Sequence, residues 1–267
     1  MNDERHSIRD TALVSSVVTI CGVAAVAIVP LIAAAWLIPP GFPYLLRQLI
    51  LCAWGTGTVL LAERHWFSAT SADAFRALGF VPARRAIVIT VLLVSVPMWI
   101  FLPCFAWIRG TSVVVRSGWL VLLIGVVLVN GITEEVIHRG FVFGHLRASR
   151  SFAGAASVSA LVFAAQHLYL IVTMGWAVGL SSVLLAAFLA YPMAFVFERG
   201  GRSIAGPAIL HTSTNTPAII LALPEELMAA ALVMQMGVIL VSVYLVFLVA
   251  APAHRARPQG SVQMRGR

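Results

Sequence analysis

The sequence contains no lysine, and charged side chains make up only 10% of its 267 residues. An ordinary soluble domain carries roughly 25% charged residues. With a hydrophobic content of 60% and a mean hydropathy of +0.96, this shortage of charge excludes a soluble enzyme and a disordered chain. Cysteine is scarce as well: Cys21, Cys52 and Cys104 all lie in apolar runs, which excludes a disulfide framework and a Cys-x-x-Cys metal knuckle. The composition is typical of a polytopic membrane protein.

Long apolar runs predict the transmembrane helices. A bilayer core about 30 Å thick needs roughly 20 apolar residues for each helix that crosses it. Eight runs meet this requirement, over residues 13–37, 45–62, 86–108, 117–146, 152–173, 176–197, 203–223 and 227–251. We therefore predict an all-α, polytopic membrane protein with about eight transmembrane helices. These helices form one domain over residues 1–253, and a flexible basic cytoplasmic tail follows over residues 254–267.

The arginines predict how the chain is oriented in the membrane. If the N-terminus is cytoplasmic, fourteen of the eighteen arginines fall in cytoplasmic segments. Arg47, Arg109 and Arg116 fall outside, and Arg139 lies within a span. Basic residues concentrate on the cytoplasmic side of membrane proteins. We therefore predict cytoplasmic N- and C-termini and a multi-pass protein of the cell membrane.

Two adjacent acidic residues, Glu134 and Glu135, lie well inside the fourth predicted span. Each intramembrane acid costs about 2.5–3.5 kcal/mol on insertion scales, so a compensating partner is expected. Arg139 follows Glu135 by four residues, a spacing that allows the two side chains to pair along one helix face. Glu134 points about 100° away from Glu135. We therefore expect Glu134 to face a cavity while Glu135 and Arg139 pair behind it.

Two other predicted spans carry unusual polar residues. Span 152–173 contains His167, and span 203–223 contains His211 and Asn215, which lie four residues apart and share one helix face. Counted from the cytoplasmic ends at about 1.5 Å per residue, these positions and Glu134 lie at depths of roughly 12–22 Å. Three separate helices therefore place a carboxylate, two imidazoles and an amide in one layer of the membrane, which predicts a shared site.

This set of side chains is suited to hydrolysis. A carboxylate and an imidazole can activate water as general bases. A second imidazole and an amide can stabilise the oxyanion of acyl transfer. No nucleophilic side chain stands out in these spans, and Ser213 is expected to bond back to a helix carbonyl. Direct attack of water on an amide is the reaction that needs the fewest groups.

Three motifs in this order resemble those of the type II CAAX prenyl endopeptidases and their bacterial Abi (CPBP) relatives. They read Glu134-Glu135-Val-Ile-His-Arg139, Phe163-Ala-Ala-Gln-His167 and His211-Thr-Ser-Thr-Asn215. The resemblance covers about residues 115–225. It implies an intramembrane endopeptidase that hydrolyses a peptide bond of a membrane-embedded or lipid-anchored substrate, without nucleic acid as a partner.

The resemblance also implies roles for single residues. Glu134 with His167 would activate the water, and His211 with Asn215 would stabilise the oxyanion. The supporting residues would be Glu135, Arg139 and Phe163.

Several alternatives remain at this stage. Glu134, His167 and His211 have the chemistry to hold Zn²⁺ with a fourth position left for water. A metal-free site is favoured because no short-spaced pair such as HExxH is present. A proton-coupled transporter also uses buried acids and histidines. A further alternative to the endopeptidase is a non-catalytic membrane protein of the bacteriocin-immunity type.

Overall fold

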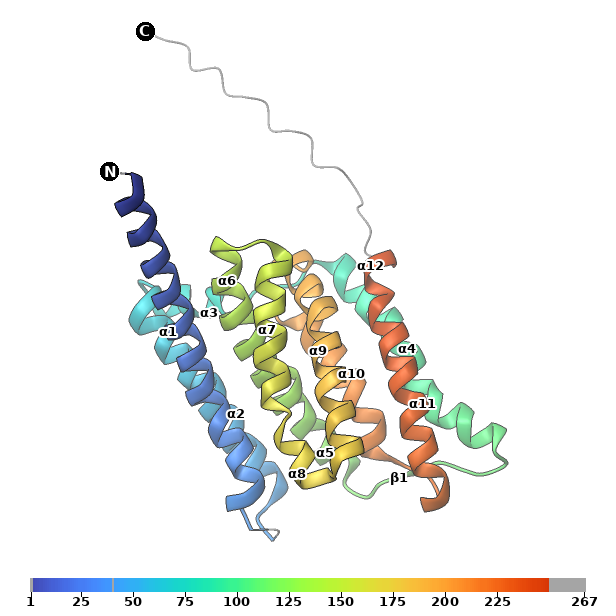
Figure 1. The fold of residues 1–267 in the computed structure, drawn as a ribbon. Helices are drawn as coiled ribbons and strands as arrows, with labels where there is room; N and C mark the ends of the chain where they lie inside the picture. Colours follow the sequence, from blue (N-terminus) through green and yellow to red (C-terminus); the bar gives the residue numbers. More distant parts are fainter. Residues whose placement is uncertain (1, 40, 250–267) are drawn as a thin grey trace.

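The computed structural model describes residues 2–39 and 41–249, with side chains over 17–34, 36–39 and 41–249. Figure 1 shows its helices side by side in one bundle. The predicted tail over residues 254–267 lies outside the described part of the chain, so it stays a prediction, as do the domain limits.

The first half of the chain supplies three long helices and the start of a fourth. These elements are α1 (Asn2–Leu37), α2 (Tyr44–Ala62), the π-helical turn η1 (Glu63–Phe67), α3 (Ser71–Ala77), α4 (Arg85–Ile108), β1 (Val114–Val115) and α5 (Trp119–Val126). The elements that follow are η2 (Val127–Thr133), η3 (Val136–Phe143), α6 (Gly144–Ser149), α7 (Phe152–Gln166), α8 (Tyr169–Met174), α9 (Trp176–Arg199), α10 (Ala205–Ile220), β2 (Leu221–Ala222), α11 (Glu225–Tyr244) and α12 (Val246–Val249).

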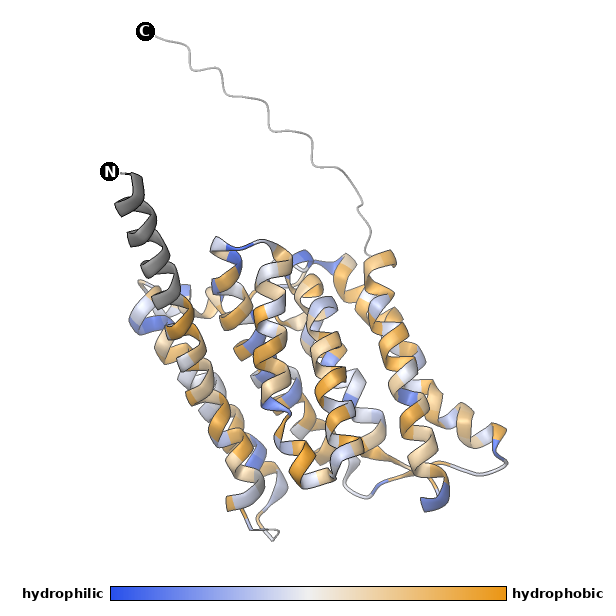
Figure 2. Cartoon of the chain, in the orientation of Figure 1, coloured by the Kyte–Doolittle hydropathy of each residue, from blue (hydrophilic) through white to orange (hydrophobic). Residues whose placement is uncertain are grey.

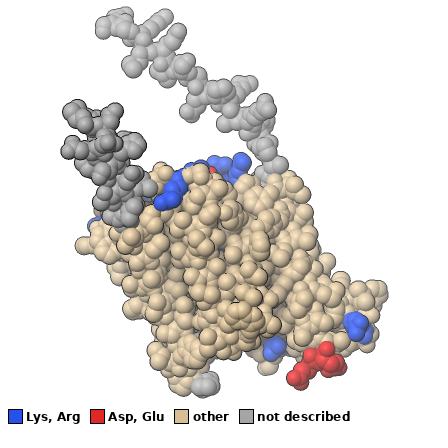
Figure 3. Space-filling view, in the orientation of Figure 1, with Lys and Arg blue, Asp and Glu red and all other residues tan. Residues whose placement is uncertain are grey.

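Among the described residues, seven helices are long and apolar enough to cross a membrane. A helix is suited to this environment because it satisfies its own backbone polar groups where no water can do so. In Figure 2 the ribbons of these helices carry the colour of hydrophobic residues over most of their lengths. On the face drawn in Figure 3, charged side chains gather at the two ends and leave an uncharged band between them. The predicted all-α membrane fold is confirmed.

The predicted span 203–223 is shorter than expected. Its helix, α10, has 16 residues, which gives a length of about 24 Å. It ends at Ile220 because the next two residues leave the helix and pair as β2 with β1. At its other end, the Ser203 hydroxyl donates to the Val81 carbonyl in the loop before α4. α10 is therefore too short to count among the seven, and the eighth crossing stays a prediction.

The two described ends of the chain lie at the same end of the bundle. Figure 1 shows the start of α1 and the short helix α12 there. This arrangement agrees with an even number of crossings. That this end faces the cytoplasm remains a prediction from the arginine distribution.

The fourth span is the centre of the bundle. Its 31 residues, Trp119–Ser149, form one continuous run in which η2 packs against α2 and α10 while η3 packs against α1 and α7. Every residue of η3 is buried. At Gly140 the backbone of Leu78 approaches so closely that a Cβ atom would overlap the Leu78 carbonyl oxygen. This packing holds the polar residues of the span away from lipid.

Candidate active site

Glu134 and Glu135 lie at the junction of η2 and η3, where the helical turns are wider than in an α-helix. The Thr133 hydroxyl donates to the Leu128 carbonyl, five residues earlier, at 2.8 Å and so satisfies one polar group of the widened turn. Widened turns of this kind are frequent at functional sites. The sequence predicted an ordinary helical period here, so the structure corrects the local geometry but keeps both acids buried.

The carboxylate of Glu134 is held on one side only. Asn130 Nδ2 donates to Glu134 Oε1 at 3.2 Å. Oε2 is buried and has no hydrogen-bond partner among the described residues. A buried carboxylate oxygen without a donor is costly unless a ligand or water supplies one. Glu134 Oε2 thus accepts no hydrogen bond from a described residue, although an imidazole nitrogen lies 3.8 Å away.

Glu135 joins Arg139 and His211 in a buried chain. Arg139 Nη1 donates to Glu135 Oε1 at 3.0 Å, and His211 Nδ1 donates to the same oxygen at 2.7 Å. The pair predicted from the four-residue spacing is therefore confirmed. The other ring nitrogen, His211 Nε2, lies 3.8 Å from Glu134 Oε2. His211 thus links the two carboxylates.

The buried group of Glu134, Glu135, Arg139 and His211 is electrically neutral when it binds one additional proton. Two carboxylates face a single guanidinium, so the group is neutral when one further proton resides on His211 or on Glu134. Protons in such a closely coupled group belong to the group as a whole rather than to one residue. An arrangement of this kind can accept a proton and return it.

His167 lies where the fifth span bends. The predicted span is present as Phe152–Met174, but α7 ends at Gln166 and His167 occupies the turn before α8. His167 Nδ1 is 2.8 Å from the Phe163 carbonyl oxygen. Because a carbonyl only accepts, Nδ1 carries the proton, and Nε2 of the neutral ring is left with a lone pair. His167 therefore keeps Nε2 available as an acceptor.

The ring of Phe163 is the packing centre of these polar residues. The Arg139 guanidinium lies over it at 4.6 Å from the ring centre. The rings of His167 and His211 contact it edge-on at centroid distances of 4.8 and 5.6 Å. The ring therefore fixes the mutual placement of a cation and two imidazoles, which come from three different helices.

The residues predicted to be catalytic meet at one cavity of about 420 Å³. It is lined by Glu134, His167, His211 and Asn215. The side-chain amide of Asn215 makes no hydrogen bond to another described residue. The remaining walls come largely from apolar side chains of α9 and α11, among them Leu185, Leu189, Leu232, Met236 and Ile239. The structure thus brings the four side chains to one chamber, while their roles remain predictions.

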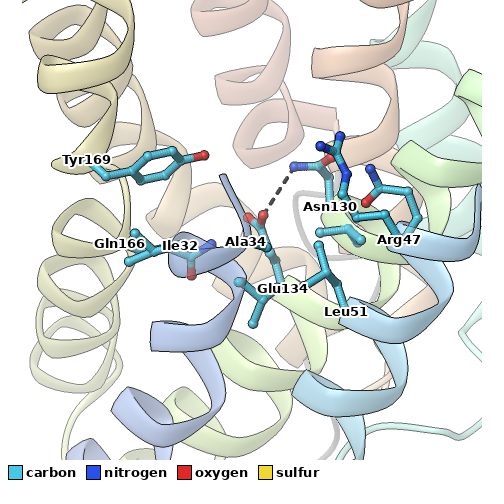
Figure 4. Close-up of a pocket in the computed structure, with 11 residues that line it drawn as sticks. Ile32, Ala34, Arg47, Leu51, Asn130, Glu134, Gln166 and Tyr169 are labelled. Atoms are coloured by element: carbon cyan, nitrogen blue, oxygen red, sulfur yellow. Dashed lines mark hydrogen bonds between the residues drawn. The ribbon is translucent and has the colours of Figure 1, made fainter. Parts of the chain in front are cut away.

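A second, smaller cavity of about 220 Å³ reaches Glu134 from the side of α1 and α2. Asn130, Glu134, Gln166 and Tyr169 line both cavities. In Figure 4, Glu134 and Asn130 lie between Arg47 on one side and Gln166 and Tyr169 on the other. Glu134 therefore stands where a small polar cavity meets a larger apolar one.

The zinc alternative requires at least three ligand side chains around one ion. Among the described residues, no three His, Cys, Asp or Glu side chains lie close enough together to hold one metal ion. The predicted set of Glu134, His167 and His211 does not form such a group in this part of the chain. We derive no chemical step through a metal.

Three lining residues were not expected from the motifs. Asn130 precedes Glu134 by four residues, so the same spacing rule that paired Glu135 with Arg139 could have found it. Tyr169 follows the bend at His167, which no sequence pattern marked. Gln235 is the single amide in the middle of the last long span, and it belongs to no motif.

Fold and site together define a multi-pass membrane protein with a chamber between its helices, in which a few polar side chains face largely apolar walls. Residues 116–217 match the family model described as Rce1-like, "Type II CAAX prenyl endopeptidase Rce1-like". The match confirms the resemblance over this segment, which holds all three motifs and well under half of the chain. No curated protein is similar enough to count as a match. The family similarity points to a CAAX-protease-type intramembrane endopeptidase.

Proposed function

We propose that this chain is an endopeptidase of the cell membrane that hydrolyses a peptide bond of a membrane-embedded or lipid-anchored substrate. The observation that carries the proposal is the Oε2 atom of Glu134, which accepts no hydrogen bond from a described residue. Glu134 lines a chamber that His167, His211 and Asn215 also line. The family match over residues 116–217 supports it.

In the proposed reaction, a water molecule binds between Glu134 Oε2 and His167 Nε2. Glu134 Oε2 accepts no hydrogen bond from a described residue. The contact of His167 Nδ1 with the Phe163 carbonyl oxygen leaves Nε2 as the acceptor of that ring. As the water oxygen forms a bond to the carbonyl carbon of the substrate, its proton passes to Glu134. General base catalysis of this kind contributes about 10²- to 10⁴-fold to the rate.

The carbonyl oxygen then carries a negative charge and needs donors. Asn215 Nδ2 supplies one, and His211 supplies a second from Nε2 when that nitrogen carries a proton in addition to the one that Nδ1 donates to Glu135. Each such donor is worth about 10²- to 10³-fold. Collapse of the tetrahedral intermediate breaks the C–N bond, and Glu134 returns its proton to the leaving amine.

The proposal is tested by comparing peptide ends in cells that produce the wild-type chain with those in cells that produce His167→Ala. Loss of the His167 imidazole removes one of the two acceptors for water, so new ends from membrane-proximal segments are expected with wild type alone. The cleaved proteins then serve as substrates for purified enzyme. Identical sets of ends, together with solute flux across vesicles that depends on His167, would favour a transporter instead.

Chelation is expected to leave the activity intact, because the proposed steps use carboxylate, imidazole and amide groups alone. The measurement is the cleavage rate of the reconstituted protein before and after treatment with EDTA and with 1,10-phenanthroline. Activity that disappears on chelation and returns when Zn²⁺ is added would overturn the metal-free proposal.

A further inference from the structure

Gln235 lies in the middle of α11 and faces the larger cavity. Together with Leu232, Met236 and Ile239 it forms the face of α11 that lines this chamber, at the three- and four-residue spacing of one helix side. The other three side chains of that face are apolar. Gln235 is thus the one polar group that α11 contributes to the chamber wall.

Both polar atoms of this side chain lack partners. Gln235 is 2% exposed, and neither Oε1 nor Nε2 has a hydrogen-bond partner among the described residues. An amide buried without partners is strongly unfavourable, most of all in a lipid-embedded interior. A glutamine that joined neighbouring helices would be hydrogen-bonded to one of them. Water or a ligand bound in the cavity is the remaining source of partners, and a ligand that replaces water there must supply the same hydrogen bonds.

The unpaired atoms define the chemistry of that group. Oε1 requires a donor and Nε2 requires an acceptor, so the complementary ligand offers both at neighbouring positions. An ion offers one kind of group, and an acyl chain offers neither. A backbone peptide group offers an N–H and a C=O, and the apolar walls beside Gln235 suit the side chains that such a segment carries.

We propose that Gln235 forms a binding subsite for a peptide group of the substrate within the larger cavity. This inference rests on the proposed endopeptidase function and extends it, because it assigns a substrate contact to α11, which lies outside the matched segment 116–217. Gln235 acts as a positioning residue, since it fixes the extended segment beside Glu134 without taking part in proton transfer.

The test uses binding in addition to cleavage. The probe is a blocked apolar pentapeptide, N-acetyl-Leu-Ala-Leu-Phe-Ala-amide, together with versions that are N-methylated at one backbone nitrogen at a time. Binding is measured in nanodiscs on a Glu134→Gln background, which prevents turnover. Gln235→Leu is expected to weaken binding of the parent peptide about tenfold to a hundredfold, as expected for two lost hydrogen bonds. N-methylation at one backbone nitrogen should weaken binding of the peptide to the protein that keeps Gln235. The same N-methylated peptide should bind the Gln235→Leu variant as well as the parent peptide does.

Thermal unfolding separates this role from a structural one. Removing an unpaired buried amide is expected to raise the unfolding temperature of Gln235→Leu while peptide binding falls. Ser95→Ala is the matched control, because Ser95 is a buried hydroxyl without a partner on the neighbouring helix α4 and does not line the cavity. It should leave peptide affinity unchanged.

Three results would overturn the inference. The first is that the peptide does not bind the protein that keeps Gln235. The second is that Gln235→Leu binds the peptide and its N-methylated versions with the same affinities as the protein that keeps Gln235, and the third is that Ser95→Ala loses as much peptide affinity as Gln235→Leu does. The proposed function fails separately. If peptide binding depends on Gln235 but the wild-type protein cleaves no peptide bond, the proposed subsite is supported and the proposed endopeptidase function is wrong. If Gln235→Leu cleaves the substrate at the wild-type rate, the proposed endopeptidase function is supported and the proposed subsite is wrong.

Discussion

Glu134→Gln is expected to lower peptide hydrolysis by about 10²- to 10⁴-fold, which is the range of general base catalysis. The amide keeps the size of the carboxylate and can still bond to Asn130, but it cannot take a proton from water. The measurement is the single-turnover cleavage rate of the purified, reconstituted variant on a substrate found in cells. Its unfolding temperature should stay close to that of wild type, because the change removes a buried charge rather than a packing group.

Glu63→Gln is the matched control for this prediction. Glu63 is also a buried glutamate that pairs with a histidine, His145, at 2.6 Å, but it lines neither of the cavities that reach Glu134. The same chemical change there should leave the cleavage rate within about twofold of wild type, as expected for a change away from the reacting atoms. Full activity in Glu134→Gln would end the proposal that this residue is the base.

Arg139→Leu is expected to cost about 3–5 kcal/mol of unfolding free energy, the usual cost of breaking a buried ion pair by removing one partner. The side chains of Arg139 and Glu135 are fully buried, so the variant leaves the carboxylate of Glu135 without its guanidinium partner. Denaturant unfolding in lipid nanodiscs measures the loss. The double variant Glu135→Gln with Arg139→Leu should regain part of the stability, because the isolated charge is gone.

Arg147→Leu provides the comparison for Arg139. Its ion pair with Glu198 is also well formed, at 2.9 Å, but the two side chains are 34% and 37% exposed. Pairs in such contact with solvent contribute less than about 1 kcal/mol. Equal losses in Arg139→Leu and Arg147→Leu would contradict the view that burial makes the Glu135–Arg139 pair critical for the fold.

The parts of the site that depend on helical spacing were predictable from the sequence. The four-residue spacing placed Arg139 beside Glu135 and put His211 and Asn215 on one face of α10. The depth estimate brought these residues to the level of Glu134, and all the predicted catalytic side chains line one chamber. On α10 the prediction succeeds because an α-helix repeats its side-chain positions with a fixed period. The Glu135–Arg139 pair forms even though the turns there are widened.

The features that depend on backbone hydrogen bonding were not predictable. The widened turns η2 and η3 carry no proline that would mark them, and the bend at His167 occurs in a stretch without glycine or proline. The end of α10 at Ile220 depends on pairing with residues 114 and 115, which lie far away in the sequence. These features are set by contacts between helices, which a single sequence does not display.

Gln235 shows a further limit of the motif approach. A lone amide in an apolar span has several structural explanations, and only the absence of a partner among the described residues separates them. The lining of a cavity by α11 likewise depends on how the last helix packs against α4 and α9. The sequence therefore predicted the polar residues that line the chamber but not the apolar residues of α11 that line it.

The most direct measurement is a structure of the Glu134→Gln protein with a bound peptide from an identified substrate. The account predicts that the peptide lies in the larger cavity, with the scissile carbonyl oxygen within about 3 Å of His211 Nε2 or Asn215 Nδ2. The carbonyl carbon should face the space between position 134 and His167. A peptide bound outside this cavity, or one whose cleaved bond lies far from these side chains, would contradict the account.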